Sequence, residues 1–154
     1  MKKLLVLLLV VLSACTQSIN YDLEEEYFEE RKGIWYYKGT LFNGEIFTLY
    51  SDETLKKKAT YKDGKKEGVW EFYFENSLIQ TASTKKVNGH LAQKGSYKAD
   101  KKDGVWVYYF SGGGLAFKRS YKDGKLDGAQ KSYKNGKLDR IESYKAGKRI
   151  EGKE

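Results

Sequence analysis

Residues 61–74 read YKDGKKEGVWEFYF, and recognisable copies of this segment recur along most of the chain. Residues 97–110 read YKADKKDGVWVYYF, and a third copy, YKDGKLDG, begins at Tyr121. With two weaker copies, the units begin at about residues 37, 61, 97, 121 and 144. A spacing of about 24 residues is typical of a repeat architecture, in which each unit is one supersecondary element that buries its apolar face against its neighbours.

Each unit has the composition of a β-hairpin. Its second half, residues 69–74 in the first clear copy and 105–110 in the next, is rich in the aromatic and β-branched residues that suit a pleated surface. These segments are bounded by turn-forming dipeptides that tolerate positive φ, namely Asp63-Gly64, Asp123-Gly124 and Asn135-Gly136. No convincing amphipathic helix supplies a second layer. The sequence therefore predicts an all-β fold, in which consecutive hairpins form one elongated, single-layered antiparallel sheet.

A second glycine recurs in each unit, at the start of the aromatic strand. It stands at Gly44, Gly68, Gly104 and Gly128. Because glycine has no Cβ, we expect a β-bulge or a close approach of the next hairpin at these positions. The spacing between the units at Tyr61 and Tyr97 is longer by half a period, which predicts an extra half-repeat, an added or lengthened hairpin, around residues 78–94.

Alternation along the aromatic strands distributes apolar side chains over both faces of the predicted sheet. Trp70 and Trp106 fall on one face, and Tyr73 and Tyr109 fall on the other. A single layer leaves such rings partly exposed, and exposed patches rich in Trp and Tyr mark interaction sites. We therefore predict that Trp70, Tyr73, Trp106 and Tyr109 bind a partner. In the alternative interpretation, the rings only stabilise a thin sheet.

The third clear unit is more polar than the two before it. At the positions of the aromatic strand it carries Gln130, Ser132 and Tyr133. A repeat array needs a polar terminal unit, since its last repeat has no neighbour to cover it. The sequence thus predicts that this unit caps the array.

The first residues of the chain have the pattern of an export signal. In residues 1–14, Lys2 and Lys3 precede an apolar run that is too short to span a membrane, and small residues follow it. The next residue, Cys15, is the only cysteine, and residues 12–15, LSAC, resemble the lipobox of bacterial lipoproteins. The resemblance implies cleavage before Cys15 and acylation of this residue, which would hold the protein on a membrane durably. The alternative is a small residue near an ordinary cleavage site.

Residues 15–32 follow the predicted signal and are rich in acids. The interpretation we favour is a solvated tether, kept extended by its like charges, between the lipid and a repeat domain at residues 33–154. The alternative is a short helix over residues 22–31, with Leu23, Tyr27 and Phe28 at helical spacing.

The charge balance bears on the partners. The chain has 29 basic and 21 acidic side chains, and loss of Lys2 and Lys3 with the signal leaves a net charge of +6. Such a surface favours attraction to anionic lipids, cell-wall polymers or acidic proteins. We expect the membrane as one partner, through the anchor, and a protein, glycan or anionic lipid as another. No nucleic acid and no cofactor are expected.

Residues suited to catalysis are few. His90 is the only histidine, and the only cysteine is Cys15, which is assigned to lipidation, so the sequence predicts neither a His/Cys metal cluster nor a Cys-His pair. Glu67, Asp103 and Asp127 recur once per unit at one turn offset, whereas the carboxylates of an active site converge. We assign them to turn formation and to pairing with nearby lysines such as Lys65, Lys101 and Lys125. The sequence predicts that the chain is not an enzyme.

Units of the form Tyr-Lys-Asp-Gly-Lys-x-acid-Gly-x-Trp-x-x-Tyr resemble the variant MORN repeat of the bacterial YwqK family, whose members are often labelled antitoxins of toxin-antitoxin systems. The resemblance covers residues 33–152, with Asp100 in the place of one glycine. It implies side-by-side hairpins that serve as a scaffold for protein or lipid contacts. The function we expect is a membrane-anchored interaction module in a bacterial cell envelope, at the outer membrane or cell surface if the host has two membranes. The alternative is an antitoxin or immunity-type protein.

Overall fold

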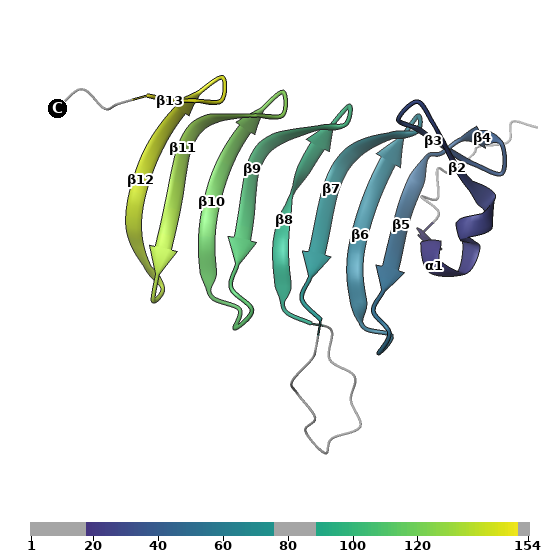
Figure 1. Cartoon of the computed structure of the whole chain (residues 1–154), viewed down its shortest axis with the longest axis horizontal. Helices are drawn as coiled ribbons and strands as arrows, with labels where there is room; N and C mark the ends of the chain where they lie inside the picture. Colours follow the sequence, from purple (N-terminus) through teal and green to yellow (C-terminus); the bar gives the residue numbers. More distant parts are fainter. Residues whose placement is uncertain (1–17, 76–88, 151–154) are drawn as a thin grey trace, which may run out of the picture.

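The computed structural model describes residues 18–75 and 89–150, so the predicted signal peptide and Cys15 lie outside the described residues. Its main element is a ten-stranded sheet in the order β1-β5-β6-β7-β8-β9-β10-β11-β12-β13 (Figure 1). From β5 to β13, every strand pairs antiparallel with the next one in the chain. The predicted sheet of consecutive hairpins is confirmed, and it is open rather than closed into a barrel.

The strands of the main sheet differ in length. They are β1 (Ser18–Asn20), β5 (Gly44–Leu49), β6 (Leu55–Lys62), β7 (Lys65–Tyr73), β8 (Leu91–Lys98), β9 (Lys101–Tyr109), β10 (Leu115–Lys122), β11 (Lys125–Lys134), β12 (Lys137–Lys145) and β13 (Lys148–Ile150). At the β1 end lie a short helix, α1 (Tyr21–Glu24), a 3-10 turn, η1 (Glu25–Tyr27), and a small second sheet. That sheet consists of β2 (Phe28–Arg31), β3 (Ile34–Tyr37) and β4 (Thr40–Leu41).

The predicted hairpin turns are present. Asp63 and Gly64 have φ values of 50° and 73°, and the other two predicted dipeptides also have positive φ at both residues. Ala99 and Asp100, with φ values of 46° and 68°, adopt the same backbone without a glycine. The β6–β7, β8–β9, β10–β11 and β12–β13 turns follow one another along one edge of the sheet (Figure 1).

The second glycine marks an irregularity in the pairing at Gly68, Gly104 and Gly128, whereas Gly44 lies in a regular part of its ladder. Gly68 and Gly104 have φ values of +72° and +70°, and the register of the β6–β7 ladder shifts between Ala59 and Tyr61. The predicted bulge is therefore confirmed here. Nothing would approach within 4 Å of a Cβ added to Gly104, so its requirement is one of backbone conformation and not of space.

The contribution of backbone conformation can be measured by comparing Gly104 with Gly112, which has equal space around it. We expect Gly104→Ala to lower the free energy of unfolding by about 1–3 kcal/mol, because alanine is strained at positive φ. Gly112→Ala is the matched control, since Gly112 also has open space around it but no positive φ. Urea unfolding followed by tryptophan fluorescence would compare the two, and equal losses would show that Gly104 has no special backbone role.

The core is a row of rings on one face of the main sheet. Tyr61, Trp70, Tyr97, Trp106 and Tyr121 follow one another across the strands, with centroid separations of 5.3, 5.0, 5.1 and 6.5 Å. Small residues lie beneath the indoles: Ala59 pairs with Trp70, and Gly95 lies against the Trp106 ring. Each ring is thus covered by the rings of adjacent units, which replaces a second layer.

Residues 18–32 are not an extended tether, and the alternative, a helix over residues 22–31, is confirmed only as far as Tyr27, by α1 and η1. Ile19 is 2% exposed, and its strand β1 pairs parallel with β5. Phe28 begins β2 instead of continuing a helix, and its ring lies 4.8 Å from that of Tyr37 and 5.2 Å from that of Phe42. Most of the acidic residues face solvent, whereas Ile19 is buried and Phe28 partly buried, so the folded domain includes residues from Ser18 onward and does not begin at residue 33.

One further prediction about the repeats needs revision, and another lies largely outside the described residues. The unit at Tyr37 departs from the others, because this residue belongs to β3 in the small sheet and the main sheet resumes at Gly44. The extra half-repeat at 78–94 falls largely outside the described residues, and Leu91 already begins β8. Since β7 pairs directly with β8, no added strand separates the two within the main sheet.

Candidate functional site

The four residues predicted to bind a partner lie on opposite faces of the main sheet. We call the face that carries Trp70 and Trp106 the ring face, and the opposite face, which carries Glu71 and Tyr73, the polar face. Trp70 is 4% exposed and Trp106 is 0% exposed, so the expectation that these rings are partly open to solvent is wrong. Tyr73 and Tyr109 are half-buried. The structure therefore brings the two pairs to separate surfaces, and only the tyrosines present their rings to solvent.

Lysines cover much of the ring face. Lys102 Nζ lies 4.0 Å from the centroid of the Trp106 ring and 5.2 Å from that of Tyr121. In the preceding unit, Lys66 Nζ lies 5.3 Å from the Trp70 ring. Cation–π contacts of this kind contribute about 0.5–2 kcal/mol each. Burial lowers the pKa of Lys102, because the ammonium group loses solvation among the rings.

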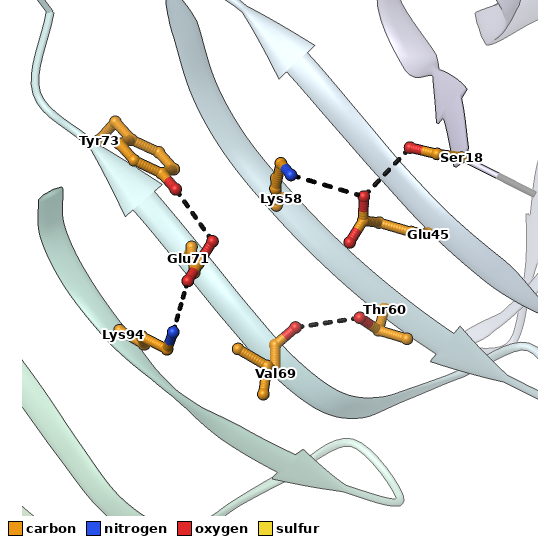
Figure 2. Close-up of polar contacts among 8 residues, drawn as sticks. All are labelled: Ser18, Glu45, Lys58, Thr60, Val69, Glu71, Tyr73 and Lys94. Atoms are coloured by element: carbon orange, nitrogen blue, oxygen red, sulfur yellow. Dashed lines mark hydrogen bonds and ion pairs between the residues drawn. The ribbon is translucent and has the colours of Figure 1, made fainter. Parts of the chain in front are cut away.

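At the β5 to β8 end, the polar face carries paired charges (Figure 2). Glu71 accepts hydrogen bonds from Lys94 Nζ at 2.7 Å and from the Tyr73 hydroxyl at 2.9 Å. Glu45 accepts one from Ser18 at 3.1 Å and lies 4.0 Å from Lys58 Nζ. The hydrogen bond from Lys94 lowers the pKa of Glu71, whereas burial, with the bond to Glu71, raises the pKa of Tyr73 to about 12.

At the β9 to β11 end, the polar face carries unpaired positive charge. Lys118 of β10 stands directly opposite Lys131 of β11 in the ladder, and Val107 of β9 is the next residue in the row. Neither lysine forms an ion pair within the described part of the chain. Beside them Val105 is 56% exposed. Like charges on directly opposed residues destabilise a sheet, so this arrangement is costly for the free protein.

The recurring carboxylates hold the turns of the next unit. Glu67 Oε2 accepts a hydrogen bond from the Ala99 amide at 2.9 Å, and Asp127 Oδ2 accepts one from the Ala146 amide at 3.1 Å. The predicted role in the turns is therefore confirmed for these two. The predicted lysine partners are wrong, since Asp127 pairs with Lys145 at 3.3 Å and Glu67 has no ion pair in the resolved ranges 18–75 and 89–150. The backbone bond from Ala146 lowers the pKa of Asp127.

These carboxylates follow the turns along an edge and do not converge. Within residues 18–75 and 89–150, no group of three or more His, Cys, Asp or Glu side chains could hold a metal ion. His90 is exposed, and its imidazole lies near Gly113 of the β9–β10 turn.

The ring face has a hollow of about 230 Å³ at its C-terminal end, between β10, β11 and β12. Gln130 lies in it at the position that Trp70 and Trp106 occupy in their units. Its Nε2 donates to the Ser120 carbonyl at 3.3 Å, as each indole N–H donates to a carbonyl ten residues earlier at 3.0 Å. Its Oε1 is buried and accepts no hydrogen bond. The third unit therefore keeps the donor of the indole and loses its ring.

Charged side chains border this hollow. The guanidinium of Arg119 lies 4.8 Å from the Phe117 ring centroid. Glu142 takes an ion pair from Arg140 at 3.8 Å and another from Arg149 at 3.7 Å, and it accepts a hydrogen bond from the Tyr144 hydroxyl at 3.3 Å. Two guanidinium groups thus pair with one carboxylate, while that of Arg119 lies against aromatic rings.

Comparison with protein-family models, with curated proteins and with solved structures found no match for this chain. No helix within the described ranges is long and apolar enough to cross a membrane.

Sequence reasoning noted Gln130 only as a polar replacement in a terminal cap. The hollow was missed because its depth depends on residues from three strands. Alignment of the units was the available signal, since Gln130 aligns in sequence with Trp70 and Trp106, and Arg119 aligns with Ala59. The lysines over the rings were also missed, although Lys66 and Lys102 recur at one offset.

Proposed function

We propose that this chain is a lipid-anchored binding module of a bacterial cell envelope, which uses the polar face of its sheet to bind a protein with an acidic surface. The lipobox-like residues 12–15 support the anchor, and the resemblance of the units to variant MORN repeats supports a scaffold role.

The observation that carries the binding surface is the pair of opposed lysines, Lys118 and Lys131. Two like charges held side by side without acidic partners are relieved when a negative group binds between them. Exposed Val105 and half-buried Tyr109 lie on the same face, and valine and tyrosine surrounded by charge are typical of the centre and rim of a protein interface. Protein surfaces supply apolar and acidic groups together, which favours a protein over a simple polyanion.

The anchor predicts a clear labelling result. We expect Cys15→Ser to abolish incorporation of a palmitate analogue and to leave the unprocessed precursor, because the hydroxyl does not replace the thiol as lipid acceptor. The neighbouring change Thr16→Ser keeps Cys15 and serves as the control. Undiminished labelling of the Cys15→Ser protein would contradict a lipid on this residue.

The binding face is tested by a photo-reactive amino acid introduced at Val105 in living cells. We expect a discrete protein adduct whose yield falls about tenfold or more when Lys118→Glu and Lys131→Glu are combined, because the acidic partner is then repelled. In the control, the charges of Lys122 and Lys125 are reversed by substitution with glutamate. These two lysines also oppose each other on β10 and β11 but lie beside the turn.

The adducts separate the possible outcomes. A protein adduct that is lost only with the Lys118 and Lys131 reversals supports the proposal. An adduct that survives those reversals, or adducts formed with lipid alone, would overturn the assignment of an acidic protein to this face.

A further inference from the structure

The row of rings on the main sheet follows a regular order, which is interrupted after Tyr121. Rings of Tyr and Trp alternate from Tyr61 to Trp106, and Tyr121 continues the row with its centroid 6.5 Å from that of Trp106. The next two positions are Gln130, where the repeat has tryptophan, and Tyr144, which leads the following unit. The row therefore lacks one ring, and the hollow between β10, β11 and β12 lies at that place.

The vacant position contains a buried polar group without a hydrogen-bond partner. The Gln130 side chain is held by its own donor, which bonds the Ser120 carbonyl at 3.3 Å. This bond leaves Oε1 free, and the oxygen is buried without a donor while the residue as a whole is only 9% exposed. A side chain that merely capped the array would turn this amide to water. The oxygen has almost no accessible surface, so the amide must turn toward the hollow before a donor on a ligand can reach this unpaired acceptor.

The surroundings of the hollow select the rest of the ligand. Where Ala59 and Gly95 lie beside the indoles of earlier units, the third unit has Arg119, paired directly with Gln130 across β10 and β11. Its guanidinium lies 5.1 Å from the Tyr108 ring centroid, and Arg140 lies across β12 beside Ser132. Because Glu142 balances only part of this positive charge, the site attracts an anionic group.

We propose that this hollow binds a planar aromatic ring that carries an N–H donor and is attached to a carboxylate, as in an indole bearing an acidic substituent. The ring occupies the vacant step between Tyr121 and Tyr144, and the carboxylate meets Arg119 and Arg140. The Gln130 amide turns toward the hollow on binding, so that its Oε1 accepts a hydrogen bond from the N–H of the ligand. A volume of about 230 Å³ holds one ring system and is smaller than the roughly 300–1,000 Å³ of pockets that enclose larger ligands.

This ligand chemistry has two sources: a free aromatic acid, or a tryptophan beside an acidic residue in another polypeptide. The site lies on the ring face, opposite the surface assigned to an acidic protein. Either assignment can therefore fail without the other.

Titration calorimetry with the purified full chain tests the site. Indole-3-acetate is the first probe, and we expect a Kd of about 0.1–1 mM for a ligand of this size. Two analogues each remove one feature: 1-methylindole-3-acetate lacks the donor, and indole-3-ethanol lacks the carboxylate. We expect each to bind at least about fivefold more weakly, since Gln130 or the arginines then lose a partner.

Protein variants locate the binding. Gln130→Trp fills the vacant step with the residue that the repeat places there, and we expect it to abolish binding while the melting temperature is kept or raised. If this variant does not fold, Arg119→Gln is the second test and should weaken indole-3-acetate but leave indole-3-ethanol unchanged. Lys148→Gln, a charge change on exposed β13, is the matched control.

A capped and amidated Asp-Trp dipeptide distinguishes the sources, because tighter binding than indole-3-acetate points to a polypeptide and weaker binding points to a free acid. The proposal is overturned if indole-3-acetate shows no binding up to about 10 mM. It is also overturned if the N-methyl analogue binds equally well, or if a folded Gln130→Trp protein still binds the probe.

Discussion

Trp106→Ala is expected to lower the free energy of unfolding by about 3–5 kcal/mol, the range for removal of a large buried aromatic side chain. Trp106 is the largest fully buried side chain of the described residues. Its ring lies between those of Tyr97 and Tyr121, and its N–H donates a hydrogen bond to the Ser96 carbonyl. Because the sheet has no second layer over these rings, a cavity here would interrupt the row that holds adjacent units together.

Urea unfolding of both proteins, followed by circular dichroism, would measure this loss. Phe110→Ala is the control, because Phe110 is an aromatic residue just beyond the end of the same strand but is half-exposed. We expect the control to cost no more than about 1 kcal/mol. A similar loss in the two variants would show that burial within the row does not stabilise the fold.

The parts of this fold that were predictable from sequence depend on local chemistry. Asp63-Gly64 forms its turn because both residues tolerate positive φ, whatever surrounds them. Gly68 lies at a bulge for the same reason, and strict alternation placed Trp70 and Tyr73 on opposite faces. Such features follow from a few adjacent residues and recur in several units, so each prediction is supported by more than one copy of the repeat.

The features that sequence reasoning missed depend on residues distant in the chain. In residues 18–32 the acidic composition concealed Ile19 and Phe28, whose burial depends on β5 and on the rings of the small sheet. The depth of Trp106 depends on a partner strand that is unusually small at one position, Gly95. Because Gly95 and Trp106 lie on different strands, the sequence of a unit does not predict that the two fit together.

The candidate sites also contain features that were visible in the sequence and features that depend on distant residues. Lys118 and Lys131 are ordinary surface lysines in the sequence, and only the register of β10 with β11 sets them directly opposite each other. The substitution of tryptophan by Gln130 was visible, and its polarity suggested a cap. That its Oε1 is left without a donor follows from the bond of its amide nitrogen to Ser120, which no composition or spacing reveals.

The second large effect is expected at Gly95, where the sequence analysis saw no special role. A Cβ at this position would lie 2.2 Å from Trp106 Cδ2, far inside any normal contact, and the ring is enclosed by its neighbours. We therefore expect Gly95→Ala to lower the free energy of unfolding by about 2–3 kcal/mol through overpacking. Backbone strain is not the cause, because Gly95 does not have positive φ.

A double-mutant cycle identifies the cause. Trp106→Phe removes part of the ring that collides with the new methyl group, so Gly95→Ala should cost at least about 1 kcal/mol less in the Trp106→Phe background than in the wild type. Gly112→Ala, which meets no atom within 4 Å, is the control for a loss of glycine as such. If the two effects at Gly95 and Trp106 simply add, the indole is not what makes glycine necessary. If they couple, the absence of a side chain at Gly95 on β8 is the reason that the fourth ring of the row, Trp106, can be buried completely in a sheet of one layer.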